Sequence, residues 1–138
     1  MLAALRDADC GLHNPQPEQL AQPGGLMSID IVGQHVDAAG TTWQVAVEVD
    51  GPTHFVRHLS ACDEAGIGTT HSQDGSTLWR NAMLQHYGYA VVMVPYQEWG
   101  ACSSRAQRVA LLQQRIRAAL LAAGVQPGGV LAGGGAGQ

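Results

Sequence analysis

The sequence contains no lysine: all seven basic residues of this 138-residue chain are arginines. This absence excludes reactions that depend on a lysine amine, such as Schiff-base formation, the lysine contact of a phosphate-binding loop and the Glu-x-Lys pair of many nucleases. No apolar run reaches the roughly 20 residues of a membrane-spanning helix, so we expect no membrane partner. The three cysteines are odd in number and widely spread, which argues against a disulfide framework and a structural zinc site.

Charge is also sparse, and its balance is acidic, with a formal net charge of −4. A negative balance weakens the case for broad, nonspecific nucleic-acid binding, because phosphate neutralisation dominates that affinity. Four of the seven arginines nevertheless fall within residues 105–117. Positive charge is therefore concentrated in one segment.

Alternation of apolar and polar residues predicts the first half of the fold. Residues 26–34 and 41–50 are each expected to form a strand, joined by a turn at 37–40 that makes them antiparallel. Residues 1–25 hold three of the six prolines and predict a linker, with a short helix at 1–8 as an option. Residues 56–75 lack clean periodicity and contain three glycines, which predicts a surface loop.

Helical signals dominate the second half. Ser76 is a good N-cap for a helix that Gly88 ends, and Ser104 with Gln107 resembles a capping box for a last helix. The apolar run at 89–96 between these helices predicts a buried strand. Residues 124–138 are rich in glycine and predict a disordered tail.

These elements predict the fold class. The helix between strands 41–50 and 89–96 forms a crossover, so the two strands are expected to be parallel neighbours. We therefore predict an α/β fold, a small mixed sheet with flanking helices, formed by residues 26–123 as one domain.

Three carboxylates lie on the two predicted antiparallel strands. Asp30, Glu48 and Asp50 could approach within several ångströms, as oxygen ligands of Mg²⁺ or Mn²⁺ do. Alternatively, Glu48 and Asp50 form the solvated face of a strand, and Asp50 accepts hydrogen bonds from the Gly-Pro turn that follows. His54 is a candidate general base or phosphate contact, or an ordinary hydrogen-bonded histidine.

Arginines and aromatic residues supply candidates for RNA contacts. Arg80 lies one turn into its helix, where it could pair with a carboxylate, bind a phosphate or remain a surface residue. Tyr96 and Trp99 could stack on exposed bases, although core packing is the default role of Trp. Arg105 and Arg108 project from the last helix, where they could approach phosphates.

Three motifs occur in order: VAVEVDGPTHF at 45–55, STLWRNAMLQHYGY at 76–89 and VPYQEW at 94–99. Together they resemble the RAP domain, the "RNA-binding domain abundant in apicomplexans", over roughly residues 27–121. The recurring elements of that family are matched by Glu48, Asp50, Gly51, Pro52, His54, Phe55, Thr77, Arg80, Leu84, Gly88, Tyr89, Val94, Pro95, Tyr96, Glu98 and Trp99.

The resemblance implies a restriction-endonuclease-like fold related to very-short-patch-repair nucleases. It also implies a mitochondrial or chloroplast protein of RNA processing, in which upstream helical repeats select the RNA. No such repeat or transit peptide occurs in this chain, so we expect it to be the C-terminal part of a longer protein. The nuclease superfamily carries Asp/Glu-x-Lys on its second strand, whereas this strand reads Glu48-Val49-Asp50 and no lysine exists to substitute.

Three functional hypotheses follow. The first is an accessory RNA-binding domain that needs no cofactor and has other RNA-processing proteins as candidate partners; its RNA contacts would be His54, Arg80, Tyr96, Trp99, Arg105 and Arg108. The second is a metal-dependent endoribonuclease, with Mg²⁺ or Mn²⁺ on Asp30, Glu48 and Asp50 and with His54 as the base. The third is a protein-interaction module of a ribonucleoprotein. The missing lysine favours the first hypothesis over the second.

Overall fold

A computed structural model of the chain describes residues 1–6, 10–22, 24–51, 55–59, 69–73 and 75–125, and within 55–59 and 69–73 it describes the backbone only. A four-stranded sheet in the order β1-β2-β3-β6 forms the centre of the fold. Its strands are β1 (His13–Leu20), β2 (Ser28–Val36), β3 (Thr42–Asp50) and β6 (Ala90–Pro95).

The sheet is mixed, as the sequence predicts. β1 and β3 each pair with β2 in antiparallel fashion, and β3 pairs with β6 in parallel, from Val45–Ala90 to Asp50–Pro95. The connection between β3 and β6 contains α2 (Gly75–His86), the predicted crossover helix. The α/β class and the mixed sheet are thus confirmed.

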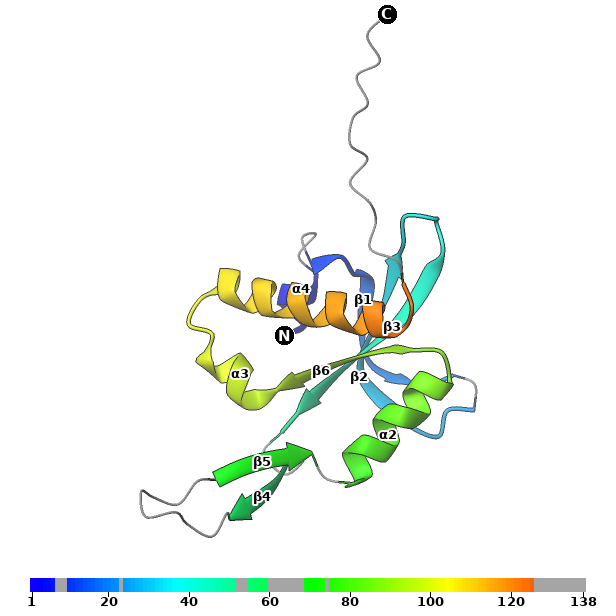
Figure 1. Cartoon of the computed structure of the whole chain (residues 1–138). Helices are drawn as coiled ribbons and strands as arrows, with labels where there is room; N and C mark the ends of the chain where they lie inside the picture. Colours follow the sequence, from blue (N-terminus) through cyan, green and yellow to red (C-terminus); the bar gives the residue numbers. More distant parts are fainter. Residues whose placement is uncertain (7–9, 23, 52–54, 60–68, 74, 126–138) are drawn as a thin grey trace, which may run out of the picture.

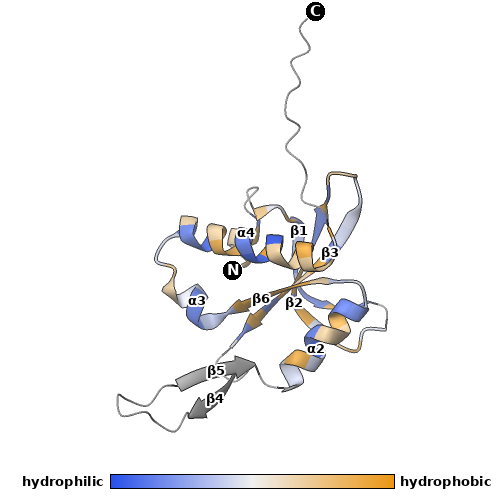
Figure 2. Ribbon diagram, viewed as in Figure 1, coloured by the Kyte–Doolittle hydropathy of each residue, from blue (hydrophilic) through white to orange (hydrophobic). Residues whose placement is uncertain are grey.

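Helices cover both faces of the sheet. In Figure 1, α4 (Arg105–Ala122) and α1 (Leu2–Leu5) lie on one side, and α2 lies on the other. The short helix α3 (Tyr96–Ala101) follows β6 and leads into α4. Hydrophobic residues concentrate in the central strands, whereas α3 and α4 carry hydrophilic segments (Figure 2).

Two buried clusters, one on each face, hold the layers together. The larger joins Val45 and Val47 of β3 to Leu112 and Ile116 of α4. The smaller joins Ala46 of β3 to Leu84 of α2. Successive residues of β3 therefore face opposite helices, which follows from the period of two along a strand.

Two predicted helix ends are confirmed by their hydrogen bonds, whereas the predicted N-cap Ser76 lies inside α2, which already begins at Gly75. The Ser104 hydroxyl accepts the N–H of Gln107 at 3.2 Å, as an N-cap does. The Gln107 side chain accepts the N–H of Ser103 at 2.8 Å, one residue earlier than a capping box requires. At the end of α2, Gly88 has φ +90° and the N–H of Tyr89 donates to the Leu84 carbonyl, which is the Schellman arrangement.

The interpretation of residues 1–25 as a linker is wrong. This segment forms α1 and β1, and Leu5, Cys10 and Leu12 are buried in the larger cluster. Pro15 and Pro17 are compatible with a strand because β1 lies at an edge of the sheet, where a missing N–H breaks no internal ladder. Proline content alone therefore misjudged an edge strand.

Two further boundaries differ from expectation. Residues 56–75, predicted as a surface loop, contain most of a two-stranded antiparallel sheet of β4 (Phe55–Leu59) and β5 (Thr69–Gln73). The strand predicted at 89–96 ends at Pro95, and Tyr96 begins α3. The predicted tail, 124–138, lies outside the described residues except for Gly124 and Val125, and Val125 is buried.

Among the helices in the described part of the chain, none combines the length and apolar character needed to cross a bilayer. The longest of them, α4, carries four arginines.

The packing of α1 gives a first prediction. Replacing the fully buried Leu5 with Ala should lower the free energy of unfolding by about 2–4 kcal/mol, because it removes apolar contacts and leaves a cavity. Leu26→Ala is the control, since Leu26 is 83% exposed and should change stability by less than about 0.5 kcal/mol. Urea unfolding measures both values, and equal stabilities would restore the linker interpretation.

Candidate functional site

The polar end of β3 faces α2. Ala46 belongs to the cluster on the α2 side of the sheet, and Glu48 and Asp50 follow it at intervals of two residues. Both carboxylates are buried, Glu48 at 6% and Asp50 at 1% exposure. The interpretation of Glu48 and Asp50 as a solvated strand face is therefore excluded.

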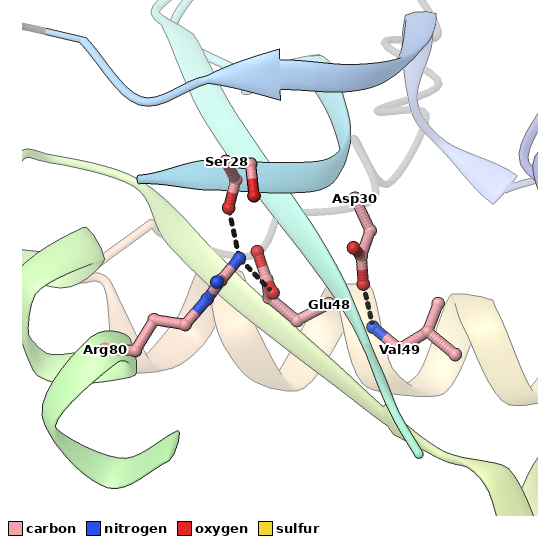
Figure 3. Close-up of polar contacts among 5 residues, drawn as sticks. All are labelled: Ser28, Asp30, Glu48, Val49 and Arg80. Carbon is pink, nitrogen blue, oxygen red and sulfur yellow. Dashed lines mark hydrogen bonds and ion pairs between the residues drawn. The ribbon is translucent and has the colours of Figure 1, made fainter. Parts of the chain in front are cut away.

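Glu48 forms an ion pair with Arg80 of α2. A guanidinium nitrogen of Arg80 lies 2.8 Å from Oε2 of Glu48 and also donates to the backbone carbonyl of Ser28 in β2 (Figure 3). One side chain of α2 thus contacts two neighbouring strands. Of the three sequence interpretations of Arg80, pairing with a carboxylate is the one that the structure supports.

Burial raises the pKa of the Glu48 carboxyl above its ordinary value. The hydrogen bond and positive charge of Arg80 oppose this effect, and the negative charge of Asp30 adds to it. Arg80 is the partner that makes an ionised Glu48 tolerable at this depth.

The pair retains unused hydrogen-bonding capacity. Within the described residues, three buried side-chain atoms have no hydrogen-bond partner: Oε1 of Glu48, Nε of Arg80 and Oδ1 of Asn81. Buried polar atoms are usually satisfied, so two of these three atoms leave hydrogen-bonding positions open on the members of the ion pair.

Asp30 has a separate role. It is exposed, and its Oδ2 accepts the N–H of Val49 at 2.8 Å, just beyond Ile31–Val47, the last paired residues of β2 and β3 (Figure 3). Its carboxylate thereby caps the end of the β2–β3 ladder. Asp30 and Glu48 approach the same stretch of sheet but serve different partners.

The predicted three-carboxylate metal site is not assembled. In the part of the chain that the structure covers, no group of three or more His, Cys, Asp or Glu residues could hold a metal ion. The physical reason is that Asp30 caps a backbone N–H and Glu48 pairs with Arg80. His54, the candidate base, lies outside the described residues.

A second polar cluster lies at the corner between α3 and α4. The guanidinium of Arg108 lies over the Trp99 ring, 5.2 Å from its centroid, in a cation–π arrangement. About two helical turns further along α4, Arg115 forms an ion pair with Glu98. Trp99 is half-buried and packs against the larger core cluster, so this corner is anchored to the sheet.

The structure divides the predicted RNA-contact residues between two places. Arg80 belongs to the α2 side with Glu48, whereas Trp99 and Arg108 belong to the α3–α4 corner. Arg105 is exposed at the start of α4, and Tyr96 is 41% exposed at the start of α3. The sequence could not predict this division, because strand order alone does not tell which face a later helix covers.

Sequence reasoning missed three participants. They are Glu98 as the partner of Arg115, the backbone carbonyl of Ser28, and Asn81. No signal marks Ser28, because any residue supplies a carbonyl. The Glu98–Arg115 pair joins residues 17 apart in different helices, so helical spacing rules do not identify it.

The charge of α4 has a single sign. Arg105, Arg108, Arg115 and Arg117 lie in this helix, which contains no Asp or Glu. The carboxylates of β3 point to the opposite face of the sheet. A chain of net charge −4 therefore presents one basic helix.

Comparison with known proteins gives one match. The sequence model of the RAP domain family matches residues 47–115, half of the chain, from β3 through Arg115 of α4. Neither the curated proteins nor the solved structures contain a match.

The ion pair gives a second prediction. Arg80→Met keeps apolar volume but leaves Glu48 charged and unpaired, which should lower the free energy of unfolding by about 2–3 kcal/mol. Breaking a fully buried ion pair would cost more, but the Arg80 side chain is 32% exposed. The double variant Arg80→Met/Glu48→Gln should recover part of that loss, because its buried carboxamide is neutral. Urea unfolding at neutral pH measures the cycle, and additive losses would contradict direct pairing.

The raised pKa of Glu48 gives a third prediction. Between the carboxyl pKa of the unfolded chain and its higher folded value, the native state binds more protons, so stability falls as pH rises. We expect the wild type to lose stability relative to Glu48→Gln as pH increases through that window. Parallel urea titrations of both proteins test the sign, and a wild type that gains stability relative to Glu48→Gln as pH rises through the window would refute it.

Proposed function

The chain belongs to the RAP domain family, and from this premise we propose that it binds single-stranded RNA through the α3–α4 corner, as an accessory domain of an RNA-processing protein. Membership of this family indicates an RNA-binding domain. The proposal assigns that role to a particular surface, because the basic residues of the described chain are unevenly distributed.

The observation that supports this proposal most directly is the Arg108–Trp99 pair near the start of α4, whose charged residues are all arginines. Arginine side chains neutralise phosphates and release counterions, which supplies most of the affinity for nucleic acid. Aromatic rings beside them give bases a stacking surface. Exposed Arg105 and Tyr96 flank the pair at the starts of α4 and α3.

Arg80 takes a different role in this proposal. Its guanidinium already bridges Glu48 and the Ser28 carbonyl, so a phosphate would have to compete with a buried carboxylate. Arg80 therefore acts as a positioning residue that fixes α2 to the sheet. The acidic end of β3 repels phosphates, which also favours binding on the α4 side.

RNA binding without cleavage is the form of the function that we propose. An endoribonuclease would need Asp30, Glu48 and Asp50 to share Mg²⁺ or Mn²⁺, and the first two are engaged elsewhere. No lysine is present to position an attacking water. The residues present therefore do not fit a site in which three carboxylates hold a metal ion beside a base, and we derive no hydrolytic step.

The relationship of the fold to nucleases and the cellular setting of the protein are proposed as well. A mixed sheet with a parallel β3–β6 pair and a crossover helix is consistent with a restriction-endonuclease-like fold. Residence in the mitochondrion or chloroplast, upstream helical repeats and contacts with other RNA-processing proteins are proposed on the family resemblance.

The fourth prediction tests the surface. Arg108→Gln should weaken binding of a labelled single-stranded RNA several-fold and lower the slope of log affinity against log salt by about 0.7, because one phosphate contact is lost. Arg117→Gln removes the same charge from the same helix. Arg117 lies nine residues after Arg108 and therefore on the opposite side of the helix. This substitution should change affinity less than about two-fold.

The same experiment decides among the functions. Binding that is unchanged by EDTA, with intact RNA, supports the proposal. Cleavage that requires Mn²⁺ and is lost in Asp50→Ala would support the endoribonuclease instead. If the wild type fails to bind RNA even at low salt, the protein-interaction module becomes the better explanation.

A further inference from the structure

A concave pocket of about 300 Å³ lies at the opposite end of β6 from the α3–α4 corner. The start of β6, the end of α2, the end of α4 and the start of β3 contribute residues to its lining. The lining includes Trp43, Gln85, Gly88, Ala119, Ala122 and Ala123. A volume at the lower limit of ligand pockets suits one planar group.

The aromatic wall of this pocket is held in place. The indole Nε1–H of Trp43 donates to Oδ2 of Asp37 at 2.9 Å, and the same carboxylate accepts two backbone N–H groups of its turn. These hydrogen bonds lower the pKa of Asp37, so the acceptor stays charged. Trp43 is half-buried, packs against the larger core cluster and also lines the pocket.

Small residues line much of the rest of the pocket. Ala119 and Ala122 of α4, Ala123 directly after it and Gly88 after α2 contribute little side-chain volume. Both α2 and α4 end at this pocket, and helix C-termini carry partial negative charge. Such a site disfavours a phosphate and accepts a neutral aromatic group, with the Gln85 amide as a hydrogen-bonding side chain.

The pocket and the proposed RNA surface share one side of α4. Arg108, Arg115 and Ala122 are spaced seven residues apart, two helical turns each, so they lie along one side of α4. The distance from Arg108 to Ala122 along the helix is about 21 Å. A strand bound to Arg108 and Trp99 would reach the pocket by following this side.

We propose that this pocket binds one unstacked nucleobase of the RNA, stacked on Trp43. The inference rests on the proposed function and adds a second base-binding position to it. The two aromatic positions, Trp99 and Trp43, then lie near opposite ends of α4, with Arg108 and Arg115 between them.

The test places a bulky side chain in the pocket and compares RNA that carries bases with an abasic oligonucleotide. Ala122→Phe, at an exposed position at the end of α4, should weaken binding of a labelled oligoribonucleotide of about ten nucleotides by roughly 5- to 100-fold, the loss expected for one stacked base. An abasic oligonucleotide of equal length should bind both proteins equally. Ala110→Phe, exposed on another side of α4, is the matched control and should match the wild type.

A second pair of variants probes the ring itself. Trp43→Leu keeps apolar packing but removes stacking, and should match the loss of Ala122→Phe, while Trp43→Phe should retain most of the affinity. Thermal unfolding confirms that each variant is folded. If Ala122→Phe binds base-bearing RNA like the wild type, or weakens abasic and normal RNA equally, the pocket assignment is overturned and RNA binding stands. If the wild type binds neither ligand, both proposals fall.

Discussion

The attachment of α2 to the sheet depends on one ion pair in a buried setting. Arg80 reaches from α2 to Glu48 of β3 and to the Ser28 carbonyl of β2, so a single side chain ties together three elements. Such a pair repays its desolvation only when both members are held in good geometry. The apolar cluster that contains Ala46 and Leu84 holds α2 against β3 and so supports that geometry.

The sheet separates charge. Carboxylates gather on the α2 side, where Arg80 compensates one of them, and arginines gather on α4 across the sheet. The hydrophobic layer between them keeps the two sets from neutralising each other. A modest net charge is thereby compatible with a basic surface, because electrostatic steering depends on the local distribution as well as on the sum.

Sequence patterns predicted what depends on local chemistry. The glycine after α2 and the Ser104 cap each act within a few residues, and the structure confirms them. The predicted apolar–polar alternation of β3 is not matched by its burial, because Val45–Glu48 are all buried. The failures are tertiary: β1 is a strand only because β2 pairs with it, and Trp99 joins Arg108 only because α3 turns the chain toward α4. For the candidate site, the pattern identified Glu48 and Arg80, but only the fold shows that they satisfy each other and that Asp30 serves a backbone N–H.

The sheet order has a consequence for solubility at high concentration. β1 and β6 are its outer strands, and unpaired outer strands invite pairing with other chains. Both contain proline: Pro15 and Pro17 in β1, and Pro95 at the end of β6. Since proline offers no N–H, each border presents an incomplete row of donors. Pro15 and Pro17, which led to the linker interpretation of this segment, thus protect the domain against edge-to-edge aggregation.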